Sequence, residues 1–334
     1  MFPEVRGMIQ IPKEFRGCAL WRDENGVRTW AQGYADWSGG RLNTPETKFG
    51  TASAGKGFVA VGGLQLVEKG LLRMDTTIGE ALDIDWKGID RDITVEQLLT
   101  HTSGIPDYFD ESVMDEYEEL WADFPNYRVR RNADLLPLFI DKPMMYPRGE
   151  RYQYNNTGFV VLAMMIEAVT GAAFDEYLKA NVFDAAGMTS TGYYEMDMLP
   201  KNCANAYIWD EARDGYRTNI YSVDAKGTGA GGAFTTVGDI MRFWDALMDH
   251  RLLSADMTEQ MLSVHAQDGG SQYGCGIWLK NGGAQVQLEG CDPGVSFVTR
   301  YDRTTDRLAV LVSNYGDNVW EIIEKDGFEP SAEG

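Results

Sequence analysis

Alternating apolar and polar residues predict β-strands at both ends of the chain. Near the N-terminus, residues 18–35 form two aromatic-rich runs on either side of Asn25-Gly26, a dipeptide typical of two-residue hairpin turns. Near the C-terminus, runs at 273–279 and 284–288 flank K-N-G-G, and runs at 295–301 and 307–313 flank D-R-T-T-D. Both ends of the chain are therefore predicted to be β.

Between these ends, apolar residues recur at the spacing of helices. The segments with this pattern are 57–69, 94–100, 158–170 and 237–249. Strands from both termini with helices between them predict an α+β fold, in which one antiparallel sheet is built from both chain ends and is flanked by helices. We expect a single domain over residues 1–334, with a sheet lobe at about 1–75 and 220–334 and an inserted helical lobe at about 76–219. The active-site cleft is expected where the lobes meet.

Composition narrows the class of protein. The 334 residues are 44% hydrophobic and 12% aromatic, which indicates a folded globular chain. The 51 acidic and 30 basic residues give a formal charge of −21, which would repel phosphate backbones and anionic membrane surfaces. Nucleic acid is therefore a poor partner, although a well-solvated surface is the simplest meaning of the charge.

The cysteines and the N-terminus bear on the compartment. Cys18, Cys203, Cys275 and Cys291 are far apart and form no C-x-x-C pair, so no disulfide scaffold is implied. The first residues contain no apolar core followed by a small-residue cleavage site, and no apolar run of about twenty residues occurs. The sequence as it stands predicts a cytoplasmic protein without a membrane span; the alternative is an extracytoplasmic protein from which a leader has been removed.

One segment, residues 107–123, contains eight acidic residues and no lysine or arginine. The simpler interpretation is a solvated helix face or loop. The alternative is a lid over the cleft that selects cationic substrates. The sequence leaves both open and favours the first.

The stretch G-T-A-S-A-G-K-G at 50–57 has two incompatible interpretations. It is nearly the phosphate-binding loop G-x-x-x-x-G-K-S/T, but Gly57 replaces the hydroxyl residue, and the preceding polar segment with Pro45 is a poor central strand. It also contains S-x-x-K, the element of an acyl-transferring serine hydrolase, with Ser53 and Lys56 on one face of a helix N-terminus. A desolvated lysine there can act as a base near neutral pH.

Two further features accompany the serine and the lysine. Glycines crowd the helix that follows, and they suggest close packing or close approach of backbone to a site; they are Gly55, Gly57, Gly62 and Gly63. About a hundred residues on, Y-x-N occurs at Tyr154 and Asn156, immediately before an apolar helix. Alternate residues of a loop can point the same way, so a proton shuttle and an orienting amide are brought together there.

Four segments together resemble a known family, in order and in spacing. They are G-T-A-S-A-G-K-G-F-V-A-V-G-G at 50–63, I-T-V-E-Q-L-L-T-H-T-S-G-I-P-D-Y at 93–108, P-R-G-E-R-Y-Q-Y-N-N-T-G at 147–158 and A-G-G-A-F-T-T-V-G-D-I-M-R-F at 230–243. The chain resembles serine hydrolases of the penicillin-binding-protein and class C β-lactamase family, which includes D-alanyl-D-alanine carboxypeptidases, D-aminopeptidases and esterases. The resemblance covers about residues 17–314 and implies a β-lactamase/DD-peptidase-like fold.

The resemblance also implies roles. Ser53 would be the acylated nucleophile, Lys56 and Tyr154 would share the proton relay, and Asn156 would hold Lys56 and contact the substrate amide. No cofactor or metal is implied, and His101, His250 and His265 are too scattered for a metal site. In the family, the segment around His101 is a turn after a helix, which makes that histidine structural.

One family element departs from the pattern. Where K-T-G or H-x-G is expected before Pro293-Gly294, this chain has Leu288, Glu289 and Gly290. Lys280-Asn281-Gly282 reads as the hairpin turn before that strand and is no substitute. The family's oxyanion hole would use the backbone N–H groups of Ser53 and Cys291, which survive changes of side chain.

Loss of the cationic side chain removes a charge-assisted hydrogen bond to a substrate carboxylate, which is worth on the order of 1.5 to 3 kcal/mol. We therefore expect a serine hydrolase for esters, amides or small D-amino-acid peptides, with Leu288, Glu289 and Gly290 on the substrate-binding wall and weak activity on β-lactams. The alternatives are a D-alanyl-D-alanine carboxypeptidase or β-lactamase proper, and a non-catalytic binding relative. The sequence leaves the oligomeric state open.

Overall fold

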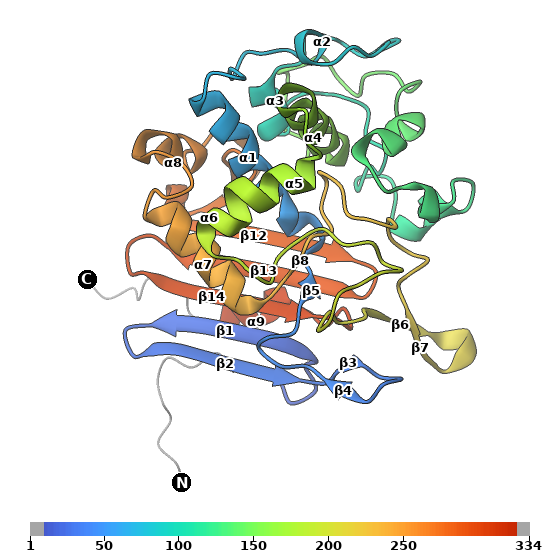
Figure 1. Cartoon of the computed structure of the whole chain (residues 1–334), viewed down its shortest axis with the longest axis vertical. Helices are drawn as coiled ribbons and strands as arrows, with labels where there is room; N and C mark the ends of the chain where they lie inside the picture. Colours follow the sequence, from blue (N-terminus) through green and yellow to red (C-terminus); the bar gives the residue numbers. More distant parts are fainter. Residues whose placement is uncertain (1–9, 326–334) are drawn as a thin grey trace.

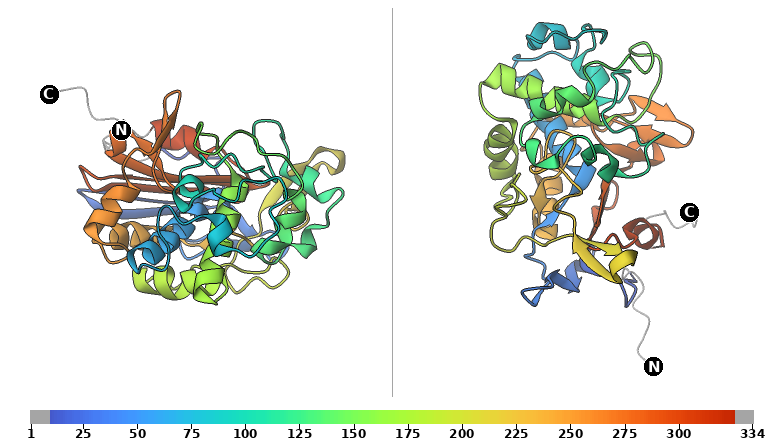
Figure 2. Two further views of the ribbon diagram at one scale, coloured as in Figure 1. Left: turned by 90° about the horizontal axis from the view of Figure 1, so that it is seen from above. Right: turned by 90° about the vertical axis from the view of Figure 1, so that its right-hand side faces the viewer.

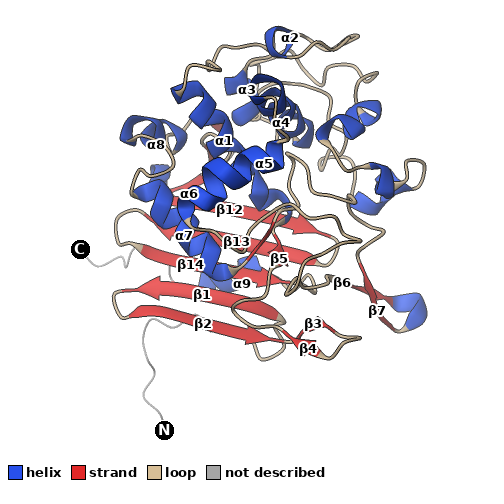
Figure 3. Ribbon diagram, viewed as in Figure 1, coloured by secondary structure: helices blue, strands red, loops and turns tan. Residues whose placement is uncertain are grey.

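An eight-stranded antiparallel sheet forms the centre of the computed structural model, which describes residues 10–325 (Figures 1 and 3). Its strand order is β2-β1-β14-β13-β12-β11-β10-β9. The strands are β1 Gly17–Asp23, β2 Gly26–Gln32, β9 Ala266–Asp268, β10 Ser271–Tyr273, β11 Trp278–Lys280, β12 Gln285–Asp292, β13 Val295–Asp302 and β14 Arg307–Ser313. The pairing of β1 with β14 joins the two ends of the chain in one sheet, as predicted.

Alternation along each strand gives the sheet two buried faces. On β1, Cys18 and Leu20 belong to the large core shared with most helices, whereas Ala19 and Trp21 belong to a smaller core under α9 (Val319–Lys325). Figure 2 shows α9 on one side of the sheet and the other helices on the opposite side. The molecule is therefore built in three layers, with the sheet in the middle.

The helical layer is organised around α4 (Asn156–Thr170), whose residues 156–163 are all buried. The other helices are α1 Lys56–Glu68, α2 Ile78–Ala81, α3 Val95–Leu99, α5 Phe174–Leu178, α6 Asp184–Ala186, α7 Val237–Met248 and α8 Ala255–Met261. The short 3-10 helices are η1 Ala52–Gly55, η2 Tyr117–Trp121, η3 Asn126–Arg128, η4 Asn132–Leu138, η6 Glu211–Arg213 and η7 Asn281–Gly283, and η5 Lys179–Phe183 is a π-helical segment between α5 and α6. Because α1 packs on both α4 and α5, the segment after Ser53 is fixed from several sides.

Three two-stranded sheets complete the fold. They pair β3 Tyr34–Asp36 with β4 Arg41–Leu42, β5 Phe49–Gly50 with β8 Phe234–Thr235, and β6 Tyr207–Asp210 with β7 Gly215–Thr218. The pair β5–β8 leads directly into η1. The strand before residues 50–57 is thus a short antiparallel one and not the central parallel strand that a phosphate-binding loop requires.

Most predicted elements are confirmed, and one is wrong. The N-terminal hairpin, the strands at 295–301 and 307–313, and all four predicted helices are present. The run 273–279 is not one strand, because Gly274 donates to the carbonyl of Ile277 and Gly276 adopts φ +72°. This turn splits the run into β10 and β11. Its apolar residues, Cys275 and Ile277, are buried in the core, which is why the run resembles a strand in sequence.

Within residues 10–325 no single helix is long and apolar enough to cross a membrane; one bent pair, Asn156–Thr170 with Phe174–Ala186, meets the length and composition criteria across a 79° bend. The expectation about a leader rests largely on residues 1–9, which lie outside the described residues.

Candidate active site

Ser53 lies on η1, the single turn that precedes α1. The turn is held by backbone hydrogen bonds from Thr51 N–H to the carbonyl of Ala233 and from Gly232 N–H to the carbonyl of Ala52. Ala52 has φ +46°, a left-handed conformation that is costly for a non-glycine residue. The backbone is therefore held in a strained turn next to Ser53, and the aligned peptides of α1 place a positive potential near it.

Lys56 is buried, and its ammonium group lies against Ser53. Its Nζ is 2.8 Å from Ser53 Oγ, 2.8 Å from Asn156 Oδ1 and 2.5 Å from the carbonyl of Ala230. Burial lowers the pKa of Lys56 to about 8, although nearby carboxylates such as Glu111 oppose the shift. At pH 7 roughly a tenth of the lysine would be neutral and able to accept the Ser53 proton.

Asn156 is the first residue of α4, and its position is fixed by both its backbone and its side chain. The buried carboxylate of Asp107 accepts hydrogen bonds from the N–H groups of Asn156 (2.8 Å) and Thr157 (3.0 Å). The Asn156 side chain accepts from Lys56 and donates to the carbonyl of Phe109 (3.0 Å) and to Glu111 (3.2 Å). The amide is therefore oriented with its oxygen towards the lysine.

Tyr154 lies beside the same lysine. Lys56 Nζ is 5.0 Å from the centre of the Tyr154 ring. Burial raises the pKa of Tyr154 well above its ordinary value, and a hydrogen bond with Ser53 opposes this shift only in part. The phenol is therefore protonated at neutral pH, which suits a proton donor better than a base.

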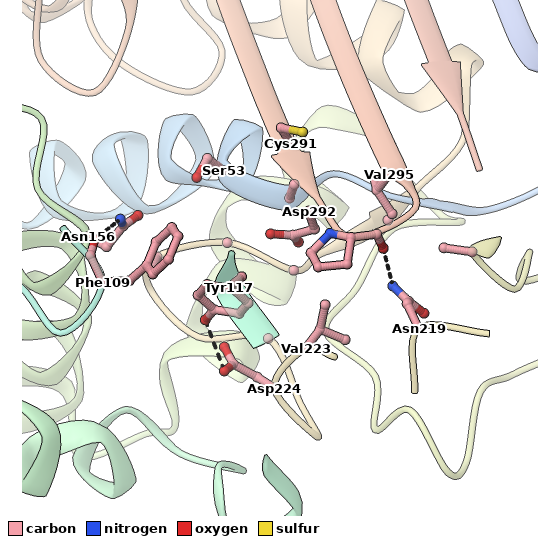
Figure 4. Close-up of a pocket in the computed structure, with 18 of the residues that line it drawn as sticks. Ser53, Phe109, Tyr117, Asn156, Asn219, Val223, Asp224, Cys291, Asp292 and Val295 are labelled. Atoms are coloured by element: carbon pink, nitrogen blue, oxygen red, sulfur yellow. Dashed lines mark hydrogen bonds between the residues drawn. The ribbon is translucent and has the colours of Figure 1, made fainter. Parts of the chain in front are cut away.

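Ser53 opens into a cavity of about 410 Å³ that is strongly acidic (Figure 4). Its apolar lining includes Phe49, Phe109, Met114, Tyr117, Val223 and Val295, and its carboxylates are Glu111, Asp115, Glu116, Asp224 and Asp292. Among residues 10–325, the side chains that line it include no lysine or arginine. Figure 4 shows Cys291 near Ser53 and the hydrogen bond from Tyr117 to Asp224 (3.1 Å) further into the cavity.

Two of these carboxyl groups are strongly perturbed. Burial raises the pKa of Asp224 and of Asp292 to about 7 each, and the charge of Asp292 adds to the rise at Asp224. A positively charged ligand in the cavity would stabilise the ionised forms of both carboxyl groups. The cavity is therefore electrostatically suited to a cation.

The acidic segment 107–123 lies at the site and not only in solvent. Seven residues of the segment line the cavity, namely Tyr108, Phe109, Glu111 and residues 114–117. The segment is tied across the cavity by the Tyr117–Asp224 hydrogen bond and by a two-pronged pair between Glu118 and Arg217 (2.8 and 2.9 Å). The segment is therefore part of the cavity wall, and its lining carboxylates Glu111, Asp115 and Glu116 are also exposed to solvent.

Sequence reasoning missed three groups that contact or face the predicted centre: Glu111, the Ala230 carbonyl and Asp292. Each carried a signal. Glu111 belongs to the acidic segment, Ala230 begins the last of the four family segments, and Asp292 follows the residue predicted for the oxyanion hole.

Leu288 and Glu289 on β12, which stand where the family has K-T-G or H-x-G, do not face the cavity as predicted. Leu288 is buried against Gly57, where an added Cβ would lie 2.6 Å from the leucine. Glu289 accepts hydrogen bonds from Trp320 Nε1 (2.8 Å) and Gln287 Nε2 (2.6 Å). Neither side chain lines the cavity that holds Ser53, so the negative charge there comes from other carboxylates. Lys280 ends β11, and its ammonium pairs with Glu324, consistent with a hairpin turn.

Gly290 brings β12 against the nucleophile. A Cβ at this position would lie 2.5 Å from Ser53 N and 2.5 Å from the Thr51 carbonyl oxygen, which are backbone atoms that cannot rotate away. The next residue, Cys291, is exposed and lines the cavity together with Ser53. Glycine at 290 thus permits the close approach that the predicted oxyanion hole would require.

We expect Gly290→Ala to lower kcat at least tenfold, because β12 must move away from Ser53, and to cost about 1–3 kcal/mol in the free energy of unfolding through overpacking. Gly270→Ala is the matched control, since a Cβ there meets no atom within 4 Å. Ester hydrolysis and thermal unfolding of both variants check this. Full activity of Gly290→Ala would show that this close approach is not needed.

No cluster of three or more His, Cys, Asp or Glu side chains that could hold a metal ion occurs in the part of the chain that the structure describes. His101, His250 and His265 contact different groups. They are hydrogen-bonded to Tyr273, to Thr258 and to the carbonyl of Gln260, respectively.

Comparison with known proteins places this geometry in a family. Residues 13–325 match the Beta-lactamase family. The chain is 28% identical over 310 residues to penicillin-binding protein 4* of Bacillus subtilis strain 168, covering 86% of this chain and 66% of that protein. It is 25% identical over 243 residues to the teichoic acid D-alanine hydrolase of Staphylococcus aureus, covering 72% and 56%.

These coverages mean that the chain spans about two thirds or less of both curated relatives. Among solved structures, a penicillin-binding protein from Bacillus halodurans superimposes with a TM-score of 0.89 at 38% identity, covering 93% of this chain and 96% of that one. The chain therefore belongs to the beta-lactamase family.

Proposed function

We propose that this chain hydrolyses esters or amides through an acyl-enzyme formed on Ser53. Neutral Lys56 accepts the proton of Ser53 Oγ as that oxygen bonds to the substrate's carbonyl carbon. The bond to the leaving group then breaks, the Tyr154 hydroxyl gives its proton to the leaving group, and the proton on Lys56 replaces it. Water then attacks the acyl carbonyl carbon and gives a proton to the same relay. The bond between the acyl group and Ser53 Oγ breaks, and the relay returns a proton to Ser53.

The remaining groups serve this reaction without changing covalently. Backbone N–H groups of Ser53 and Cys291 would hold the oxyanion, which is where negative charge develops in the transition state. Asn156 keeps the Lys56 ammonium aligned with Ser53 and presents its amide to the cavity. The observation that carries this assignment is the 2.8 Å contact between Lys56 Nζ and Ser53 Oγ in a buried site.

The cavity favours a substrate that carries an ammonium group. It contains five carboxylates, and among the described residues no basic side chain lines it. One relative is named for D-alanine on teichoic acid, and an alanyl ester or amide carries a free amine. We therefore propose amine-bearing esters or amides, with D-aminoacyl groups as the leading class.

The same charge disfavours the carboxylate of a penicillin or of a terminal D-alanine. The relatives named as penicillin-binding proteins support the second candidate, reaction with β-lactams. Acylation by a β-lactam is compatible with Ser53 and Lys56, but efficient hydrolysis would require anion binding that this cavity does not offer. Hydrolysis of a chromogenic cephalosporin at the efficiency of a dedicated β-lactamase would overturn the preference.

A pair of substrates with and without a free amine tests the proposal. We expect kcat/KM for D-alanine p-nitroanilide to exceed that for N-acetyl-D-alanine p-nitroanilide at least tenfold, equivalent to about 1.4 kcal/mol. Asp292→Asn should shrink this ratio, because it removes a cavity carboxylate. Asp256→Asn, an exposed carboxylate on α8, is the control and should keep the ratio. Equal rates for both substrates in the wild type would refute the charge preference.

A further inference from the structure

His101 is a fully buried histidine next to the proposed centre. It follows α3 and adopts φ +56°, in the left-handed region. Its ring centre is 4.4 Å from that of Tyr154 and 5.1 Å from that of Phe159. A residue of this size in a strained backbone conformation is retained only where surrounding contacts determine it.

His101 accepts hydrogen bonds from the backbone on both sides of Tyr154. Its carbonyl oxygen accepts from Gln153 N–H at 3.0 Å, and its Nδ1 accepts from Asn155 N–H at 3.1 Å. Tyr154 is the single residue between these two anchors. The backbone that carries the phenol is therefore attached to one residue through two bonds, one of which depends on the imidazole.

The two ring nitrogens of His101 make hydrogen bonds of opposite direction. Since Nδ1 accepts a hydrogen bond from the Asn155 N–H, the ring proton is on Nε2, which lies 3.1 Å from the hydroxyl of Tyr273 and donates to it. Burial, together with the charge of Lys56, lowers the pKa of His101 well below its ordinary value. The ring therefore stays neutral with Nδ1 free to accept.

We propose that His101 is a positioning residue for Tyr154, acting through the acceptor Nδ1 that holds Asn155 N–H; this rests on the proposed function, in which Tyr154 carries a proton to the leaving group. A misplaced phenol would slow proton transfer and leave substrate binding unchanged. Loss of the Nδ1 acceptor should therefore lower kcat and leave KM unchanged.

Four substitutions distinguish the roles of the two ring nitrogens. His101→Phe keeps a ring against Tyr154 and loses both side-chain hydrogen bonds. His101→Asn can place an amide oxygen near the Nδ1 position, and His101→Gln can place an amide nitrogen near the Nε2 position. Tyr273→Phe removes only the partner of Nε2. For D-alanine p-nitroanilide, whose leaving nitrogen must be protonated, we expect kcat at least tenfold lower in His101→Phe and His101→Gln, partly recovered in His101→Asn, and within about threefold of wild type in Tyr273→Phe.

KM should stay within about threefold of wild type in all four variants. Equal kcat in His101→Asn and His101→Gln, or a loss in Tyr273→Phe as large as in His101→Phe, would overturn the proposal in favour of general packing. If His101→Phe does not fold, the Asn–Gln pair with matched melting temperatures decides the matter. Wild-type protein that shows no Ser53-dependent turnover would instead defeat the proposed function, so the two failures are distinguishable.

Discussion

Ser53→Ala is expected to lower the turnover rate of p-nitrophenyl acetate by about 10³-fold or more, while the protein keeps its melting temperature. The reason is that the hydroxyl supplies the atom that forms the covalent bond, and no neighbouring group on η1 can replace it. Ser53 Oγ also contacts Lys56, but that lysine keeps two other oxygen partners, Asn156 and Ala230, so the fold should survive.

Ser271→Ala provides the matched control for this measurement, because Ser271 is an exposed serine on β10. It should retain full activity. Steady-state rates with the two variants and thermal unfolding by circular dichroism suffice. Turnover by Ser53→Ala within tenfold of wild type would mean that another residue is the nucleophile or that the hydrolysis is not enzymatic.

Removal of the Lys56 amine is the second large change. We expect Lys56→Ala and Lys56→Met each to lower kcat/KM by about 10² to 10⁴, the usual contribution of a general base. The methionine variant preserves volume and so reports the amine, whereas the alanine variant also leaves a cavity. Both variants strip the Asn156 oxygen and the Ala230 carbonyl of a donor, which should cost about 1–3 kcal/mol of stability.

The pH profile gives the sign of this effect. Because the neutral amine is the active form and the pKa of Lys56 lies at about 8, wild-type kcat/KM should rise with pH and level off above pH 8. The Lys56→Met profile should lack that rise. A profile that falls between pH 7 and 9, or Lys56→Ala with near-normal turnover at neutral pH, would show that Lys56 is not the base.

Local sequence signals were sufficient for most of the fold. Asn25-Gly26 between two aromatic runs gave the hairpin β1–β2, and apolar spacing at 158–170 gave the buried helix α4. The run 273–279 failed because residues buried in a turn have the same apolar character as residues buried in a strand. Gly274 and Gly276 were the only local warning.

Recognition of Ser53, Lys56, Tyr154 and Asn156 depended on residue types at fixed spacings, which a single sequence shows directly. The direction of the side chains on β12 depended on register against β13 and on what covers each face, which it does not show. Glu289 was therefore expected to face the substrate, whereas its carboxylate accepts a hydrogen bond from the indole N–H of Trp320. Likewise, only the tertiary fold brings Asp224 into the same cavity as Asp292.

Direct observation of the acyl-enzyme tests the central claim most sharply. The protein is mixed with the p-nitrophenyl ester of D-alanine, quenched in acid within the first turnover, and weighed intact before peptide mapping. We predict a mass increase of one D-alanyl group on the peptide that contains Ser53, and no increase in Ser53→Ala. A labelled peptide elsewhere, or turnover of the ester with no covalent species at any time, would contradict the account.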